Sequence, residues 1–227
     1  MKSILKPLSA LILSACITNV SAQSVPEKYS IGLGGAASFS SARTGAQHSF
    51  FEKNGNRIGY ALNLDSRYYL AEWAAVGMQY DYCNMQKNDD KVHVHFIRPA
   101  LTLRYVMNRD ALTFSLGIGY FNYQDRVRFQ SNDYRLYSNK TSKGYCGLSF
   151  GIGYDFAISN SLGGNVHLDF LTANWFVNDD FRLYNPDKIG CDDEYEYCDK
   201  YDDGVNHHLF KNNLTFINLG FNIVFGK

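Results

Sequence analysis

The sequence predicts an all-β fold, namely an eight-stranded antiparallel up-and-down transmembrane β-barrel with short periplasmic turns and long extracellular loops. Three observations lead to this prediction. Apolar and polar residues alternate over repeated stretches of roughly ten residues. Aromatic residues make up 15% of the chain, which holds 19 Gly and only 4 Pro, and this composition is typical of β structure. Long and short connections between the stretches also alternate.

The first 22 residues have the features of a secretory signal peptide. Lys2 and Lys6 form a basic start, Leu8–Ala15 an apolar core, and Val20-Ser21-Ala22 a small-residue cleavage site. The apolar core is shorter than the roughly 20 residues that a membrane-spanning helix needs. The sequence therefore predicts export without a transmembrane helix.

Cleavage between Ala22 and Gln23 would leave residues 23–227 as the outer-membrane β-barrel domain. In a second interpretation, Leu13-Ser14-Ala15-Cys16 is a lipoprotein box and Cys16 is acylated. We favour cleavage after Ala22, because a barrel that already spans a membrane has little need of a lipid anchor. Both interpretations predict an exported protein.

Eight stretches with a two-residue period are predicted to be strands. They span Tyr29–Phe39, Arg57–Leu70, Ala74–Cys83, Val92–Tyr105, Leu112–Tyr120, Tyr145–Ile158, Leu162–Phe170 and Ile217–Phe225. In the fourth stretch the apolar residues change parity between Phe96 and Ile97. Because Pro99 lacks a backbone donor and is tolerated mainly at edges and bulges, we expect a β-bulge at this point.

The connections predict the topology of the barrel. Those predicted to be long are Ser40–Asn56, Asn84–Lys91, Tyr123–Lys143 and Asn174–Asn213, and those predicted to be short are Ala71–Trp73, Met107–Asp110 and Ser159–Ser161. Tight periplasmic turns and large extracellular loops are typical of an even-stranded outer-membrane barrel. Both termini would lie in the periplasm of a Gram-negative cell.

A soluble lipocalin-like barrel also has eight alternating strands, and the glycines argue against it. Gly117, Gly119, Gly151 and Gly153 lie on the polar face of the strands, which would be the outer surface of a lipocalin. Glycine weakens a strand, whereas the crowded lumen of a small barrel requires it. Tyrosines also lie toward the ends of the apolar faces, as in interfacial aromatic girdles. We therefore expect the apolar face to contact lipid.

The fourth and fifth stretches carry a family resemblance. The segment from Phe96 to Tyr105, a short turn, and the segment from Leu112 to Tyr120 resemble the central hairpin of the outer-membrane protein β-barrel domain family. The chain end resembles an outer-membrane assembly signal, with apolar residues at every second position up to Phe225, although Gly226 and Lys227 follow. The resemblance implies insertion by the barrel-assembly machinery into outer-membrane lipid, and no particular reaction.

The inward faces are predicted to carry a lumenal polar network. Its candidate residues are Asp65, Arg67, Asp81, Arg98, Arg104, Asp155, His167 and Asp169. Side chains just fill the interior of an eight-stranded barrel, so we expect ion pairs and hydrogen bonds that neutralise buried charge. A narrow path for protons, ions or small solutes is the alternative, and a wide aqueous pore is excluded at this strand number.

Neither a cofactor nor a catalytic constellation is predicted. The 22 basic and 22 acidic residues lack the basic excess that phosphate-mediated binding of nucleic acid requires. His93 and His95 share a strand face, and His207-His208 follow two aspartates. Such histidines more often lie on a solvated rim than bind a metal. The segment Asp199–Gly204 lacks the ordered spacing of a calcium loop. An outer-membrane enzyme is the least favoured hypothesis.

Two of the predicted loops differ in charge. Tyr123–Lys143 is rich in arginine and lysine, and Asn174–Asn213 is strongly acidic. These loops either pair with each other as solvated surface loops or bind an extracellular or host ligand. The sequence therefore predicts a non-enzymatic, monomeric outer-membrane barrel that is structural or binds a ligand through its loops.

The cysteines differ in their expected environments. Cys83 is predicted to face the lumen and Cys146 the lipid, so these two cannot pair. Cys191 and Cys198 lie in the same long loop of an exported chain. A Cys191–Cys198 disulfide is therefore predicted, because exported proteins meet oxidising compartments.

Overall fold

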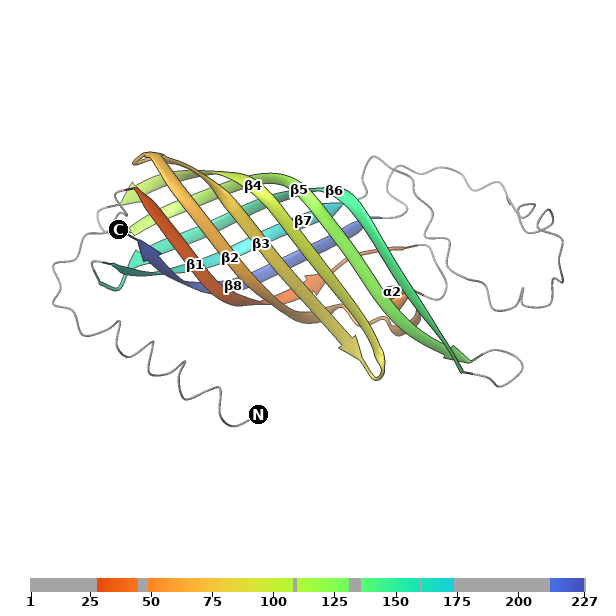
Figure 1. Ribbon diagram of the computed structural model, residues 1–227. Helices are drawn as coiled ribbons and strands as arrows, with labels where there is room; N and C mark the ends of the chain where they lie inside the picture. The colour runs from red at the N-terminus through yellow and green to blue at the C-terminus, as the bar shows by residue number, and fades with distance from the viewer. Residues whose placement is uncertain are drawn as a thin grey trace.

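The computed structural model describes residues 28–44, 49–107, 110–130, 136–159, 161–173 and 213–226. Within them, eight antiparallel strands form a closed barrel in which neighbours in sequence are paired and β1 closes against β8 (Figure 1). The strands are β1 (Tyr29–Ser40), β2 (Ile58–Ala71), β3 (Ala74–Lys87), β4 (Asp90–Met107), β5 (Asp110–Gln130), β6 (Leu136–Ala157), β7 (Leu162–Ala173) and β8 (Leu214–Gly226). The predicted eight-stranded up-and-down barrel is confirmed.

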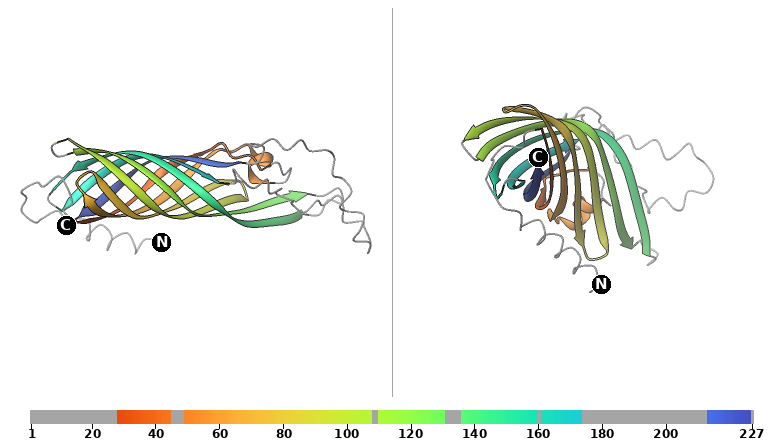
Figure 2. Two further views of the ribbon diagram at one scale, coloured as in Figure 1. Left: turned by 90° about the horizontal axis from the view of Figure 1, so that it is seen from above. Right: turned by 60° about the vertical axis from the view of Figure 1, so that its left-hand side comes forward.

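One short helix, α2 (Phe50–Asn54), lies between β1 and β2. No helix in the described ranges is long and apolar enough to cross a membrane. Figures 1 and 2 place α2 at the end of the barrel opposite the C-terminus. We call this end the α2 end. The opposite end, where Ser30 pairs with Gly226, is called the terminal end.

The outer surface of the barrel carries a belt of exposed apolar side chains. Leu116 is 61% exposed and Leu62 is 53% exposed, because alternate residues of a closed barrel point outward. Tyr29, Tyr68, Tyr105 and Tyr154 edge this apolar belt at the terminal end, and Tyr82 and Tyr120 edge it at the α2 end. Since large apolar side chains cover this face, it is suited to an apolar environment and not to water.

The predicted bulge in β4 is wrong. β4 keeps one continuous register with β3, from Leu103 opposite Ala74 to Asp90 opposite Lys87. The parity of the apolar residues changes because the surroundings change: Val92, Val94 and Phe96 are buried inside the barrel, whereas Ile97, Leu101 and Leu103 are exposed outside it. The apolar pattern therefore passes from the outer face of the strand to its inner face.

Two predicted long loops also prove to be largely strand. The expected loop Asn84–Lys91 is a tight turn at Asn88-Asp89, where Asn88 has a positive φ of 54°, a conformation that asparagine tolerates better than most residues. The expected loop Tyr123–Lys143 is largely paired, because β5 and β6 continue to the Gln130–Leu136 pair. The long and short alternation is thus broken at the β3–β4 turn.

The paired ends of β5 and β6 project beyond the rest of the barrel at the α2 end (Figures 1 and 2). Pairing with β4 ends at Arg126, opposite Lys91, and pairing with β7 ends at Gly147, opposite Ala173. We call the part of β4, β5 and β6 beyond Tyr120 the strand extension. It is a hydrogen-bonded sheet where a long loop was predicted.

Candidate functional site

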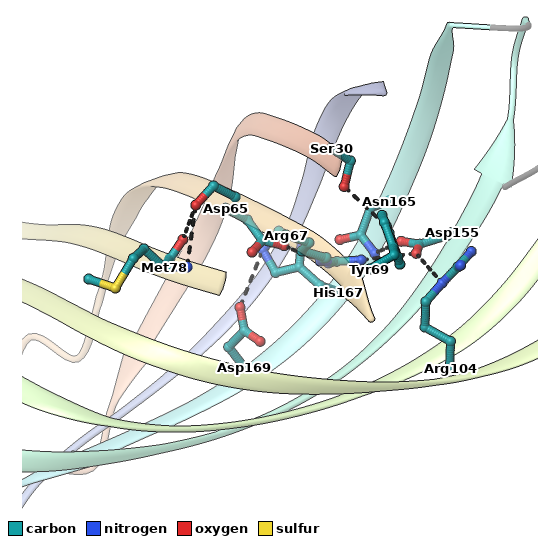
Figure 3. A network of polar contacts seen from close by, with 11 residues as sticks. Ser30, Asp65, Arg67, Tyr69, Met78, Arg104, Asp155, Asn165, His167 and Asp169 are labelled. Atoms are coloured by element: carbon teal, nitrogen blue, oxygen red, sulfur yellow. Dashed lines mark hydrogen bonds and ion pairs between the residues drawn. The ribbon is translucent and has the colours of Figure 1, made fainter. Parts of the chain in front are cut away.

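The lumen in the terminal half of the barrel holds a connected set of charged side chains. Arg67 contacts Asp65 at 2.6 Å and Asp155 at 2.9 Å (Figure 3). Asp155 also accepts a hydrogen bond from the Asn165 side chain at 2.6 Å and lies 3.8 Å from Arg104 Nε. One carboxylate thus joins two guanidinium groups from β2 and β4, which keeps the buried charges paired.

A second charged group lies nearer the middle of the lumen. Arg98 forms an ion pair with Asp81, which also accepts a hydrogen bond from Asn63. His167 Nε2 lies 3.6 Å from Asp169 Oδ2 (Figure 3). The structure therefore places all eight predicted network residues inside the barrel, as one group around Arg67 and Asp155 and as the separate pairs Arg98–Asp81 and His167–Asp169.

A polar cavity of about 30 Å³ lies between these groups. Asp65, Asp81, Arg98, His167 and Asp169 contribute to its lining. A cavity needs about 10 to 15 Å³ of such space to hold a water, so this one has room for about two waters. Its size fits a hydrated ion-pair network and not a solute pathway.

The α2 half of the lumen contains a cluster of aromatic rings. Phe96, Phe121 and Phe216 pack against one another in sequence with tilted rings, and their ring centroids are 5.3 Å apart for the first pair and 6.0 Å for the second. Phe51 of α2 extends this cluster through an edge-to-face contact, with its ring centroid 6.0 Å from that of Phe216. All four rings are essentially fully buried. We call these four rings, together with Phe50, the aromatic plug.

The short helix that supplies two plug residues has well-formed ends. The Ser49 side chain accepts a hydrogen bond from Glu52 N at the N-terminus, as an N-cap residue does. Gly55 ends the helix with a φ of 59°, a left-handed conformation that glycine adopts without strain. These caps turn the chain back at once, so that Phe50 and Phe51 point into the barrel end.

Two carboxylates attach α2 to the strands. Asp125 accepts hydrogen bonds from Phe50 N at 3.3 Å and from the Tyr123 hydroxyl at 3.0 Å. Asp90 accepts from Lys53 Nζ at 2.9 Å, from the Asn54 side chain at 2.8 Å and from Arg128 N at 2.7 Å. α2 is thus bound to the β3–β4 turn and to β5 at the same time.

The contacts of Asp90 shift its acidity. Burial by itself would raise the pKa of the Asp90 carboxyl. The hydrogen bonds from Arg128 N, Lys53 and Asn54 outweigh burial, because they favour the charged form, and the pKa lies below its usual value. The carboxylate is therefore the form that holds α2 in place.

The histidines and cysteines in the described residues do not form a metal site. His93 and His95 lie on the outer face and accept or donate hydrogen bonds with the hydroxyls of Tyr82 and Tyr80, at 2.7 and 2.8 Å. Within the described ranges, no three potential ligands gather. Cys83 is buried, Cys146 is exposed on the outer face, and both are unpaired, in agreement with their predicted faces.

Other predicted sites lie outside the described residues. These are the cleavage site at Ala22 and Gln23, Cys16, the Cys191–Cys198 pair, His207-His208, the segment Asp199–Gly204, and all but the last residue of the acidic stretch Asn174–Asn213. The predicted disulfide and the predicted cleavage therefore remain predictions.

The aromatic plug was not predicted from the sequence. Phe50 and Phe51 lie in a segment that was predicted to be a loop, and their apolar pair is the only signal there. A second signal was the parity change in β4, which places Val94 and Phe96 inside the barrel. Apolar residues on the inner face of β4 indicate that side chains fill the lumen at this end of the barrel.

The geometry defines an eight-stranded antiparallel barrel with an apolar exterior and a lumen closed by side chains. Among solved structures, the chain is similar to Neisserial surface protein A, with a TM-score of 0.50 and 8% identity over 92% of this chain and 100% of that one. It is also similar to Ail, the attachment invasion locus protein of Yersinia pestis, with a TM-score of 0.47 and 13% identity over 88% of this chain and 99% of that one.

The likeness to the Neisserial protein agrees with the fold and extends over the whole barrel. No protein-family model matches the chain. No curated protein matches it either.

Proposed function

We propose that the protein is a non-enzymatic, non-conducting integral outer-membrane barrel that displays its strand extension at the cell surface for ligand binding. The observation that carries the proposal is the division of the barrel along its axis. The apolar belt covers the middle of the outer surface, and the aromatic plug fills the lumen at the α2 end.

Location in the outer membrane is supported by the inside-out distribution of side chains. Charged residues such as Arg67 and Asp81 are buried in the lumen, while Leu33, Leu116 and Leu219 are exposed on the outside. A closed barrel satisfies every ladder hydrogen bond within the protein, and this is a condition for crossing hydrocarbon. The solved structure of similar fold is described as a surface protein, which accords with such a location.

Orientation follows from the two ends of the barrel. The terminal end has the compact Glu72-Trp73 turn, the start of β1 and the end of β8, as the periplasmic side of an outer-membrane barrel does. The α2 end carries the plug and the strand extension. We infer that the α2 end is extracellular and that binding uses this end.

A narrow ion or solute pore was the alternative function, and the plug argues against it. An ion passing through the barrel would have to cross the layer of Phe51, Phe96, Phe121 and Phe216, which offers no polar ligand to replace its water. Transfer of an unpaired charge into such surroundings is strongly unfavourable. The polar network then serves to fill and neutralise the lumen.

Planar-bilayer recording tests this proposal directly. The purified full chain is reconstituted, insertion is verified by protease protection, and current is recorded in symmetric potassium chloride. We expect inserted protein to give no discrete conductance steps, because the plug blocks the lumen. Reproducible single-channel steps from inserted protein would favour the pore and contradict the proposal.

A further inference from the structure

Three basic side chains form a row across the outer face of the strand extension. Lys91 of β4 lies directly opposite Arg126 of β5, and Arg126 lies directly opposite Lys140 of β6. All three have the outward parity of Tyr120, and Arg126 and Lys140 are exposed. Directly opposed residues of antiparallel strands have Cβ atoms roughly 5 Å apart. We call Lys91, Arg126 and Lys140 the cationic row.

The charge of the cationic row is not neutralised by the part of the chain that the structure describes. No carboxylate there forms an ion pair with Lys91, Arg126 or Lys140, although Arg128 on the same face pairs with Asp89 at 2.7 Å. Arg126 Nε only reaches the Ser138 hydroxyl at 3.4 Å. Like charges directly opposite one another destabilise a sheet, so an anion bound on the row would relieve a repulsion that the described residues leave in place.

The neighbouring histidine responds to the same positive charge. Burial, His95 and Lys91 together lower the pKa of His93, which lies one outward position from Lys91 along β4. The outer face of the extension also carries Gln124 and Ser142, which lie opposite each other. Amide and hydroxyl groups beside cations are suited to a ligand that bears both anionic groups and hydroxyls.

The height of the row indicates what kind of ligand reaches it. At ~3.4 Å per residue, Arg126 lies about 20 Å along β5 beyond Tyr120, or ~14 Å above the edge of the apolar belt for a strand tilt of ~45°. The polar layer of an ordinary bilayer leaflet is only about 5 to 8 Å deep. A compact phospholipid headgroup would therefore not reach the row, whereas a taller saccharide headgroup would.

The row also faces sideways. It lies on the same outer wall as the apolar belt, so in the membrane it meets the headgroups of adjacent lipids and not the open medium above the barrel. We propose that the cationic row binds the phosphorylated saccharide headgroup of a glycolipid in the surrounding outer leaflet. This inference rests on the proposed function, because it requires the α2 end to project from the outer membrane.

A titration of the full chain in neutral detergent tests the inference, with phosphorylated lipopolysaccharide and its enzymatically dephosphorylated form as probes. The variant Lys91→Gln/Arg126→Gln/Lys140→Gln removes the three charges and keeps polar side chains. Each cation near an anionic headgroup contributes about fivefold to affinity, so we expect a loss on the order of 100-fold for the phosphorylated probe. The dephosphorylated probe should bind wild type and variant about equally.

Arg128→Gln is the matched control, because it removes a charge on the same face that Asp89 already neutralises. We expect it to bind the phosphorylated probe within about twofold of wild type. The urea unfolding midpoint of the triple variant without probe should stay the same or rise, since a repulsion is removed. A lower midpoint would indicate that the row is a structural element and would overturn the inference.

Two other outcomes would overturn it. One is equal affinity of wild type and triple variant for the phosphorylated probe. The other is binding of the soluble polyanion dextran sulfate by the row without binding of the glycolipid, which would assign the row to a soluble partner. Neither outcome concerns the plug, so the conductance experiment tests the proposed function separately.

Discussion

Individual side chains in this barrel are placed by the charge balance of a closed lumen. Arg98 is the clearest example, because its guanidinium pairs with Asp81 and also lies over the Phe96 ring, 4.6 Å from the centroid. A cation over an aromatic face is stabilised by the ring quadrupole. Arg98 therefore joins the polar network to the aromatic plug.

Removal of Arg98 should be costly for this reason. Arg98→Met would leave the Asp81 carboxylate buried without its cation, and we expect a loss of about 3 to 5 kcal/mol in the free energy of unfolding. Urea unfolding in detergent, followed by the heat-modified gel shift, measures it. The double variant Arg98→Met/Asp81→Asn should recover much of the loss, because no charge is then stranded. If the double variant is less stable than Arg98→Met, burial of an unpaired charge is not the cause.

The period of two residues was enough to assign these side chains to the lumen, but not to assign their partners. Arg67 and Asp155 lie on β2 and β6, which are not adjacent in the sheet, yet they are 2.9 Å apart across the lumen. Contacts of this kind depend on how strand tilt and barrel closure superimpose different levels of the wall. The local sequence does not determine this geometry, so the partners across the lumen could not be predicted.

Among the elements, α2 and the strand extension were the hardest to predict. The helix has five residues, which is too short for an amphipathic period. In the extension the inner residues include Tyr123 and Asp125 and the outer ones Gln124 and Arg126, so polar residues on both faces hide the alternation. The apolar alternation of β6 between Cys146 and Ile158 was strong enough to predict that strand from the sequence.

The attachment of α2 should depend on pH through Asp90. Its pKa in the folded state is lowered by the hydrogen bonds to the carboxylate. The stabilisation is therefore fully present above the unfolded-state pKa of about 3.9 and is lost as pH falls through the lower folded-state value. Thermal unfolding of wild type and Asp90→Asn between pH 7 and pH 3 measures it. The stability difference should be constant down to about pH 5 and should shrink below pH 4. A difference that stays constant to pH 3 would exclude Asp90 as the titrating attachment.

In the whole molecule, one outer wall of the barrel is suited to two environments, an apolar one along the belt and an aqueous one beyond it. The same strands expose Leu116 and Phe150 in the apolar belt, and Arg126 and Lys140 beyond it. The interior reverses this order, with the ion-pair network at the level of the belt and the aromatic plug toward the α2 end, where Asp90 and Asp125 attach α2. The eight strands and the apolar belt were predictable, because alternation is a local property. The reversal was not, because it depends on where the membrane ends.

One pair of substitutions on β6 tests whether the apolar belt faces lipid. Phe150 lies within the belt and Ser142 beyond it, both exposed on the same face. Phe150→Arg should lower the free energy of unfolding by about 2 to 4 kcal/mol, because this is the cost of arginine on a lipid-facing midplane. Ser142→Arg should assemble normally. The measurement is the amount of heat-modifiable, folded protein in the outer-membrane fraction of expressing cells. We expect a strong loss for Phe150→Arg and none for Ser142→Arg. Equal amounts of both folded variants would show that the belt does not face lipid.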